Sequence, residues 1–201
     1  MNPLNTVAGT IIGGIVLAVV VVLATMGNHV VSTMSVIIWL HVLAGITWIG
    51  LLYYFNFVQA PALAEAASDD GGPGGAGITK YVAPRALWWF RWGALFTWLT
   101  GAAYLAHAKL FGAAFTLGMM GDTVNSYALT IGIGAWLGTF MFLNVWVIIW
   151  PNQKKVLGMV EATAEEIAKA KRTAFLASRF NTLLSIPTVM SMVGAHHGFV
   201  M

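Results

Sequence analysis

The chain has 201 residues, of which 59% are hydrophobic and 8% are charged, with a formal net charge of +3 at pH 7. Soluble domains carry about 25% charged residues, so this composition predicts an integral membrane protein that contacts the lipid bilayer. The basic residues are too few and too dispersed for a nucleic-acid-binding protein. The absence of cysteine excludes disulfides, cysteine-ligated iron–sulfur clusters and c-type haem attachment through Cys-x-x-Cys-His.

Five apolar runs follow one another along the chain, and each is long enough to cross a bilayer, which takes about 20 residues. The first lacks the basic start and the cleavage site of a secretory signal, so we interpret it as a span as well. We therefore expect an all-α membrane protein in which spans two to five form a four-helix bundle and the first helix is peripheral. The expected spans are residues 7–26, 34–59, 87–108, 125–150 and 175–196.

The segments between the spans predict one membrane domain over residues 1–201 rather than several domains. Residues 62–83 contain the glycine-rich run 71–75, which favours a flexible loop. Residues 152–172 form a charged, amphipathic segment in which Thr163 and Glu166 have the spacing of a helix-capping box. The second span follows the short link 27–33, which contains His29.

Basic residues are distributed unequally between the two expected sides of the membrane. The loops after spans two and four and the adjoining helix ends hold nine of them, whereas the opposite side holds only Lys109. Because Lys and Arg are retained on the cytoplasmic side, we expect a multi-pass protein of a bacterial inner membrane with a cytoplasmic N-terminus and a periplasmic C-terminus. The nine are Lys80, Arg85, Arg91, Lys154, Lys155, Lys169, Lys171, Arg172 and Arg179.

This orientation places all five histidines toward the outer leaflet, although they come from different spans. His41 lies inside the second span, where an unpaired ionisable group is costly. Histidines that converge from separate helices are typical of metal sites in bundle cores. We therefore expect metal ligands among His41, His107, His196 and His197, with His196 preferred over His197; His29, in a link, is the weakest candidate.

The surroundings of these histidines favour haem b over other metals. His41, Gly45 and Trp48 share one helical face, and a glycine beside aromatic residues suits a porphyrin plane; on the third span, Tyr104 lies on the same stripe as His107. Imidazole is a common haem ligand, although zinc and copper remain alternatives.

Two arginines near the expected cytoplasmic ends of spans three and five, Arg91 and Arg179, are candidates for an anion site. Such a site would take a haem propionate, a quinone or an acidic substrate. The alternative is that both side chains extend to lipid headgroups.

Four stretches resemble the membrane domain of the urate oxidase N-terminal family. They lie in spans two to five, and the third is the most specific; the His41 stretch is also loosely similar to membrane protoporphyrinogen oxidases. The four are residues 39–59 (WLHVLAGITWIGLLYYFNFVQ), 84–93 (PRALWWFRWG), 140–155 (FMFLNVWVIIWPNQKK) and 177–187 (ASRFNTLLSIP).

The resemblance implies an oxidoreductase or an electron-transfer subunit. Longer members of the family are membrane-bound urate-oxidising enzymes with a C-terminal cytochrome c domain. This chain has no Cys-x-x-Cys-His motif, so we expect any electron acceptor to be a separate periplasmic cytochrome c or part of a larger membrane complex. The catalytic residues and the substrate stay open.

Three hypotheses for function follow. The first is a haem b-binding membrane redox protein that transfers electrons from an organic donor or a quinol toward a periplasmic cytochrome c. The second is a cofactor-free accessory or structural subunit of a respiratory or photosynthetic complex. The third is a copper-handling membrane protein.

Overall fold

The computed structural model describes residues 2–27 and 30–198, and the regular structure in these ranges is helical throughout. By its internal contacts the chain divides into two units, Met1–Val36 and Ile37–Met201, and each unit is described by itself. The all-α prediction is therefore confirmed for the described residues.

The first unit contains a short 3-10 turn, Pro3–Asn5, and the helix α1, Val7–Thr25. Thr6 caps α1, because its Oγ1 accepts a hydrogen bond from the Gly9 amide at 3.0 Å. None of the α1 side chains is buried, and the helix is apolar on all sides, which is typical of a membrane span.

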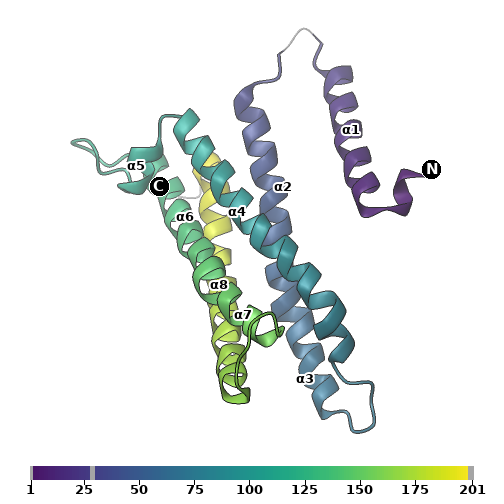
Figure 1. Cartoon of the computed structure of the whole chain (residues 1–201). Helices are drawn as coiled ribbons and strands as arrows, with labels where there is room; N and C mark the ends of the chain where they lie inside the picture. The colour runs from purple at the N-terminus through teal and green to yellow at the C-terminus, as the bar shows by residue number, and fades with distance from the viewer. Residues whose placement is uncertain (1, 28–29, 199–201) are drawn as a thin grey trace. The chain divides into compact units, whose positions relative to one another are not determined.

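The second unit holds the remaining helices, and within it α6 and α8 lie side by side (Figure 1). Helix α2 begins at the end of the first unit and continues without a break into η2 and α3. In the same way α6 continues through η4 into α7. The elements are α2 Thr33–Tyr53, η2 Tyr54–Gln59, α3 Ala60–Ser68, η3 Ile78–Val82, α4 Ala83–His107, α5 Phe111–Phe115, α6 Ser126–Leu143, η4 Asn144–Ile149, α7 Trp150–Val156 and α8 Ala164–His197.

Three helical stretches in the described residues are both long and apolar enough to cross a membrane: Val7–Thr25, Thr33–Ser68 and Ser126–Val156. Helices α4 and α8 are long enough as well, with 25 and 34 residues, but they are less apolar because each carries charged and hydroxyl side chains. The structure is therefore compatible with a membrane protein, and two of the five expected spans rest on length alone.

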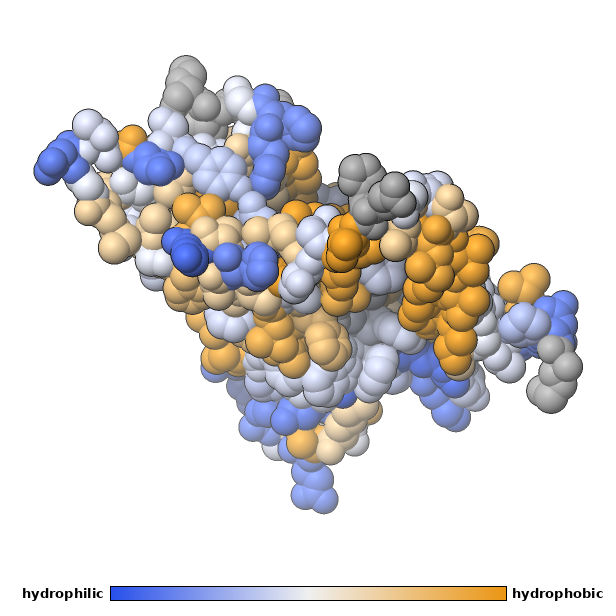
Figure 2. Space-filling view, turned by 90° about the horizontal axis from the view of Figure 1, so that it is seen from above, coloured by the Kyte–Doolittle hydropathy of each residue, from blue (hydrophilic) through white to orange (hydrophobic). Residues whose placement is uncertain are grey.

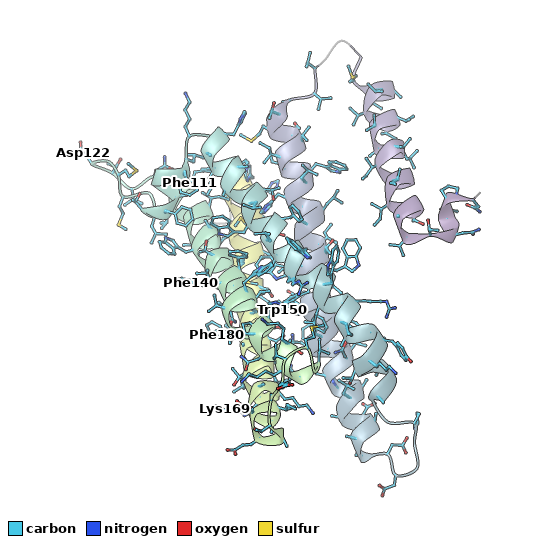
Figure 3. All side chains as sticks on the ribbon, in the orientation of Figure 1. Phe111, Asp122, Phe140, Trp150, Lys169 and Phe180 are labelled. Atoms are coloured by element: carbon cyan, nitrogen blue, oxygen red, sulfur yellow. The ribbon has the colours of Figure 1, made fainter. Side chains whose placement is uncertain are left out.

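The outer surface of the second unit is rich in large apolar side chains. Phe140 of α6 and Phe180 of α8 project outward (Figure 3) and are 52% and 54% exposed. Seen from above, the surface of the whole chain carries hydrophobic patches between more polar areas (Figure 2). Apolar surface of this extent marks contact with lipid or with another protein.

The expected loop over residues 62–83 is wrong at both ends. Helix α3 occupies Ala60–Ser68, and the non-helical stretch begins at Asp69 and reaches only to the glycine-rich run before η3. The segment APALAEAAS is rich in alanine, the best helix former. Likewise, the helix expected to end at Trp150 continues to Val156.

A π-helical turn before each proline explains how these helices continue past it. Each of the three π-helical segments described here, η2, η3 and η4, stands directly before an X-Pro pair. A proline ring collides with the carbonyl four residues earlier and donates no hydrogen bond, and a π-turn, with its extra residue, shifts that carbonyl. The widened turns close with Ala60 N–H to Phe55 O before Pro61, Ala83 N–H to Ile78 O before Pro84, and Trp150 N–H to Val145 O before Pro151.

Apolar side chains from α2, α4, α6 and η4 form the main core of the second unit. Close backbone approach is part of this packing: a Cβ on Gly93 of α4 would lie 3.2 Å from the backbone nitrogen of Trp48 on α2. A glycine at this position therefore lets the two helices meet. The core consists of Trp48, Leu52, Leu87, Phe90, Ala94, Met141, Val145 and Ile149.

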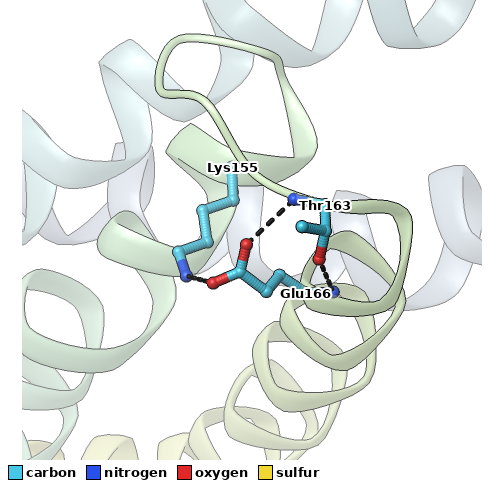
Figure 4. A network of polar contacts seen from close by, with 3 residues as sticks. All are labelled: Lys155, Thr163 and Glu166. Carbon is cyan, nitrogen blue, oxygen red and sulfur yellow. Dashed lines mark hydrogen bonds and ion pairs between the residues drawn. The ribbon is translucent and has the colours of Figure 1, made fainter.

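The predicted capping box is confirmed at the start of α8. Thr163 Oγ1 accepts from the Glu166 amide at 3.2 Å, and Glu166 Oε2 accepts from the Thr163 amide at 2.9 Å (Figure 4). Lys155 of α7 reaches the same carboxylate at 3.4 Å. The box satisfies two amide donors that would otherwise lack partners at the helix start.

Candidate functional site

His41 projects from α2 onto α4, where the backbone carbonyl of Thr97 fixes its orientation. Its Nδ1 lies 2.9 Å from Thr97 O and 3.2 Å from Thr100 Oγ1. A carbonyl oxygen only accepts, so Nδ1 carries the proton and Nε2 keeps its lone pair. The half-buried ring therefore has one anchored nitrogen and one nitrogen suited to binding a metal.

Gly101 makes room for this imidazole, and Gly45 lies in ordinary contact distance of the same helix. A Cβ on Gly101 would lie 3.0 Å from His41 Cε1, and a Cβ on Gly45 would lie 3.9 Å from Thr97 Cγ2. The hydroxyl of Thr97 donates to the Gly93 carbonyl of its own helix at 2.7 Å. The predicted face of His41, Gly45 and Trp48 thus contacts α4, with Trp48 buried.

His196 belongs to a second arrangement, which we call the phenol cluster: Tyr104, Tyr127 and His196. The two phenolic oxygens are 2.6 Å apart, and His196 Nε2 lies 3.2 Å from Tyr104 OH and 3.1 Å from Tyr127 OH. The cluster joins α4, α6 and α8. Tyr104 was predicted as a site residue, whereas Tyr127 was not, since a single tyrosine at the start of a span gives no signal in the sequence.

The structure does not bring the predicted histidines together around one metal. In residues 2–27 and 30–198, no three His, Cys, Asp or Glu side chains form a group that could hold a metal ion. His107 and His197 are exposed at the ends of α4 and α8, and His29 lies outside the described residues. Haem iron takes only one or two protein ligands, so a haem site at His41 would not need a group of this kind.

The two predicted arginines pack on aromatic rings rather than on each other. The Arg91 guanidinium lies 3.8 Å from the centre of the Trp150 ring, and that of Arg179 lies 5.1 Å from the Phe175 ring. Both contacts are of the cation–π type. Arg91 Nε is buried with no hydrogen-bond partner, so this side chain has an unused donor.

Near the middle of α8, amide side chains hold this helix against η2 and η4. We call Asn56, Asn144, Asn181 and Ser178 the amide cluster. Asn56 Nδ2 donates to Ser178 Oγ at 2.8 Å, and Asn144 Nδ2 donates to Asn181 Oδ1 at 2.7 Å. Segments η2 and η4 each supply an asparagine that bonds to α8. These contacts therefore fix the positions of the three segments relative to one another.

A cavity of about 470 Å³ adjoins the amide cluster. It lies between η2, α3, the start of α4, α7 and α8, and Asn56, Gln59, Lys171 and Ser178 are among its lining residues. Gln59 Oε1 is buried and has no hydrogen-bond partner. The sequence alone did not locate this cavity, because its walls come from three stretches that are far apart along the chain, residues 55–90, 149–157 and 171–178.

Comparison with known proteins gives one family. The model described as urate oxidase N-terminal matches residues 120–201, the region that contains α6, η4, α7 and α8. The predicted resemblance is therefore confirmed over these residues. No curated protein and no solved structure matches the chain.

Proposed function

We propose that this chain, whose residues 120–201 match the urate oxidase N-terminal family, is a membrane redox protein that binds haem b through His41. Electrons would pass from it toward a periplasmic cytochrome c. The observation that carries the proposal is the His41 imidazole, whose Nδ1 is held by Thr97 while Nε2 keeps its lone pair. Histidines that bind metals usually donate their other ring N–H to a carbonyl or carboxylate in this way.

The residues around His41 fit a flat prosthetic group better than a closed metal cage. Gly45 and Gly101 are small, and the site offers no carboxylate or thiolate. Haem iron changes between two oxidation states and would supply single-electron transfer. The chain's own contribution would be to ligate the iron with Nε2 and to hold the ring with the Thr97 carbonyl and the Thr100 hydroxyl.

The proposal includes five membrane-spanning helices: α1, α2 with η2 and α3, α4, α6 with η4 and α7, and α8. Helices α4 and α8 would cross the bilayer despite their polar stripes, because those side chains bond within the bundle. Examples are Tyr53 OH with Ser185 Oγ at 2.9 Å and Trp98 Nε1 with Thr139 Oγ1 at 3.0 Å. With basic residues cytoplasmic, His41 would lie in the periplasmic half of a bacterial inner membrane.

A pyridine haemochrome spectrum of the protein purified in mild detergent, together with iron and copper analysis, tests the proposal. We expect haem b with iron in the wild type and less than about a tenth of it in His41→Ala, as expected for loss of an axial ligand. His107→Ala is the matched control and should keep its haem, since His107 is exposed at the helix end. A wild type that stays colourless after reconstitution with haem, or that holds copper alone, would refute the proposal.

The family match also suggests a substrate test. Urate-dependent reduction of an added cytochrome c should be measured with the haem-loaded protein in vesicles. Turnover that is lost in His41→Ala would make the chain an enzyme. Haem without urate turnover would favour an electron-transfer subunit.

A further inference from the structure

The cavity beside the amide cluster has the size and walls of a small-molecule site. Its volume of about 470 Å³ falls within the range of about 300–1,000 Å³ found for ligand pockets. Most of its lining is apolar, and two of its aromatic residues, Phe55 and Phe90, meet edge to face at 5.5 Å. These walls favour a ligand with a flat ring and an apolar tail.

One wall of the cavity presents an acceptor that lacks a donor. Gln59, at the end of η2, lines the cavity, and its Oε1 is buried without a hydrogen-bond partner. Buried polar atoms are nearly always paired, so an unpaired oxygen beside a cavity calls for a ligand that donates. Ionised carboxylates and quinones, which only accept, cannot supply this bond.

Helix α8 also lines the cavity, and its residues there present donors. Ser178 Oγ accepts from Asn56 Nδ2, which leaves the hydroxyl proton of Ser178 to donate into the cavity. Lys171, two turns earlier on α8, lines the same cavity with an ammonium group. A ligand in this cavity therefore meets an acceptor on η2 and donors on α8, among mostly apolar side chains.

We propose that this cavity binds a quinol, an aromatic ring with two opposed hydroxyl groups and an apolar tail. One hydroxyl donates to Gln59 Oε1, and the opposite oxygen accepts from the α8 side. The cavity binds the quinol more tightly than the corresponding quinone, because only the quinol can donate to Gln59. Its role as electron donor rests on the function proposed above, whereas binding itself does not.

Calorimetric titration of the full chain in detergent, without oxygen, tests this inference. The three ligands are a short-tailed benzoquinol, the matching benzoquinone and decanoate. We expect the quinol to bind, and to bind about tenfold more tightly than the quinone, as for one buried hydrogen bond. No quinol binding, or a preference for the quinone or for decanoate, would overturn the inference.

Variants locate the binding site. Gln59→Met, which keeps the volume and removes the acceptor, should weaken quinol binding about tenfold, whereas Asn152→Leu, on α7 outside the cavity lining, should not. Lys171→Ala should weaken it about threefold, with Lys169→Ala, an exposed lysine near the start of α8 (Figure 3), as the control. Because both lysines are exposed, this second pair decides the question even if Gln59→Met does not fold. Unchanged quinol binding in Lys171→Ala, or in a folded Gln59→Met, would refute the site.

The haem content of the same preparations separates the two proposals. A chain that binds quinol at Gln59 and holds no haem contradicts the proposed function and leaves this inference standing. A chain with haem at His41 and no quinol binding overturns this inference alone.

Discussion

The amide cluster and the phenol cluster both join α8 to neighbouring helices, and they differ in burial. Asn181 and Asn56 are 0% and 2% exposed, whereas Tyr127 is half-buried and His196 is exposed. A buried amide that loses its partner is costly, so the amide cluster fixes the positions of the helices. An exposed imidazole can exchange partners with water at little cost, which leaves the phenol cluster free to change its hydrogen-bond partners.

His41 lies between these two extremes. Its ring is half-buried and fixed through one nitrogen, so it combines a rigid position with an available lone pair. We therefore expect function at a polar group whose position is fixed by one hydrogen bond while another of its polar atoms stays available.

The largest expected effect is at the centre of the amide cluster. Asn181→Leu removes the acceptor of Asn144 Nδ2 and the donor to the Met141 carbonyl. We expect the free energy of unfolding in detergent to fall by about 2–3 kcal/mol. Asn152→Leu is the control, because Asn152 bonds only its own helix, and it should change stability by less than about 0.5 kcal/mol. Equal losses in both variants would contradict the comparison.

The second prediction concerns the space beside His41. Gly101→Val would push side-chain atoms against the imidazole, because even a Cβ lies 3.0 Å from Cε1. We expect a loss of about 1–2 kcal/mol, together with a clear fall in haem content as the ring leaves its position. Gly138→Val, where nothing lies within 4 Å of the added Cβ, should keep its haem. Haemochrome spectra and thermal unfolding measure both variants.

The third prediction tests the start of α8. Thr163→Ala removes the side-chain acceptor of the Glu166 amide and should cost about 1 kcal/mol. Chemical unfolding followed by circular dichroism measures the loss. Thr163→Ser, which keeps an acceptor, should restore most of it, and a loss as large in Ser as in Ala would show that the hydroxyl is not the cause.

Smaller effects are expected in the phenol cluster. Tyr104→Phe removes the hydroxyl that meets Tyr127 and His196, yet water can replace it at an exposed histidine. We expect a change in the free energy of unfolding below about 0.5 kcal/mol. A loss comparable to that of Asn181→Leu would show that the phenol cluster constrains the helices as strongly as the amide cluster does.

The smallest effect is a pH dependence at Glu166. Its pKa lies below the ordinary value because its carboxylate accepts from the Thr163 amide and faces Lys155. A lowered pKa in the folded state contributes stability that is fully present above the unfolded value of about 4.3 and is lost as the pH falls through the folded value. Below about pH 4.3, wild type should therefore lose melting temperature relative to Glu166→Gln. Parallel curves for the two proteins would contradict this assignment.

The sequence predicted the helical class, the capping box and the contact face of His41, because hydrophobic runs, Thr163–Glu166 spacing and helical periodicity act locally. It did not predict α3, since Pro61 reads as a helix end unless the π-turn before it is known. The cavity and Tyr127 depend on contacts between distant segments, so no local pattern contains them. In the described part of the chain the predicted histidines do not form a group of three or more that could hold a metal ion, since His41 bonds to Thr97 whereas His196 bonds to Tyr104 and Tyr127.

Because α2 continues into α3 without a break, the combined helix is longer than the hydrocarbon layer of a membrane is thick. The continuous helix Thr33–Ser68 has 36 residues, which at about 1.5 Å per residue makes a rod of about 54 Å, whereas the hydrocarbon layer is about 30 Å thick. If one end of the rod lies in the bilayer as proposed, its last turns stand among the headgroups or beyond them. The cavity at Gln59 would then open at the interface between the hydrocarbon layer and the headgroups. A molecule with an apolar tail and a polar ring concentrates at this interface.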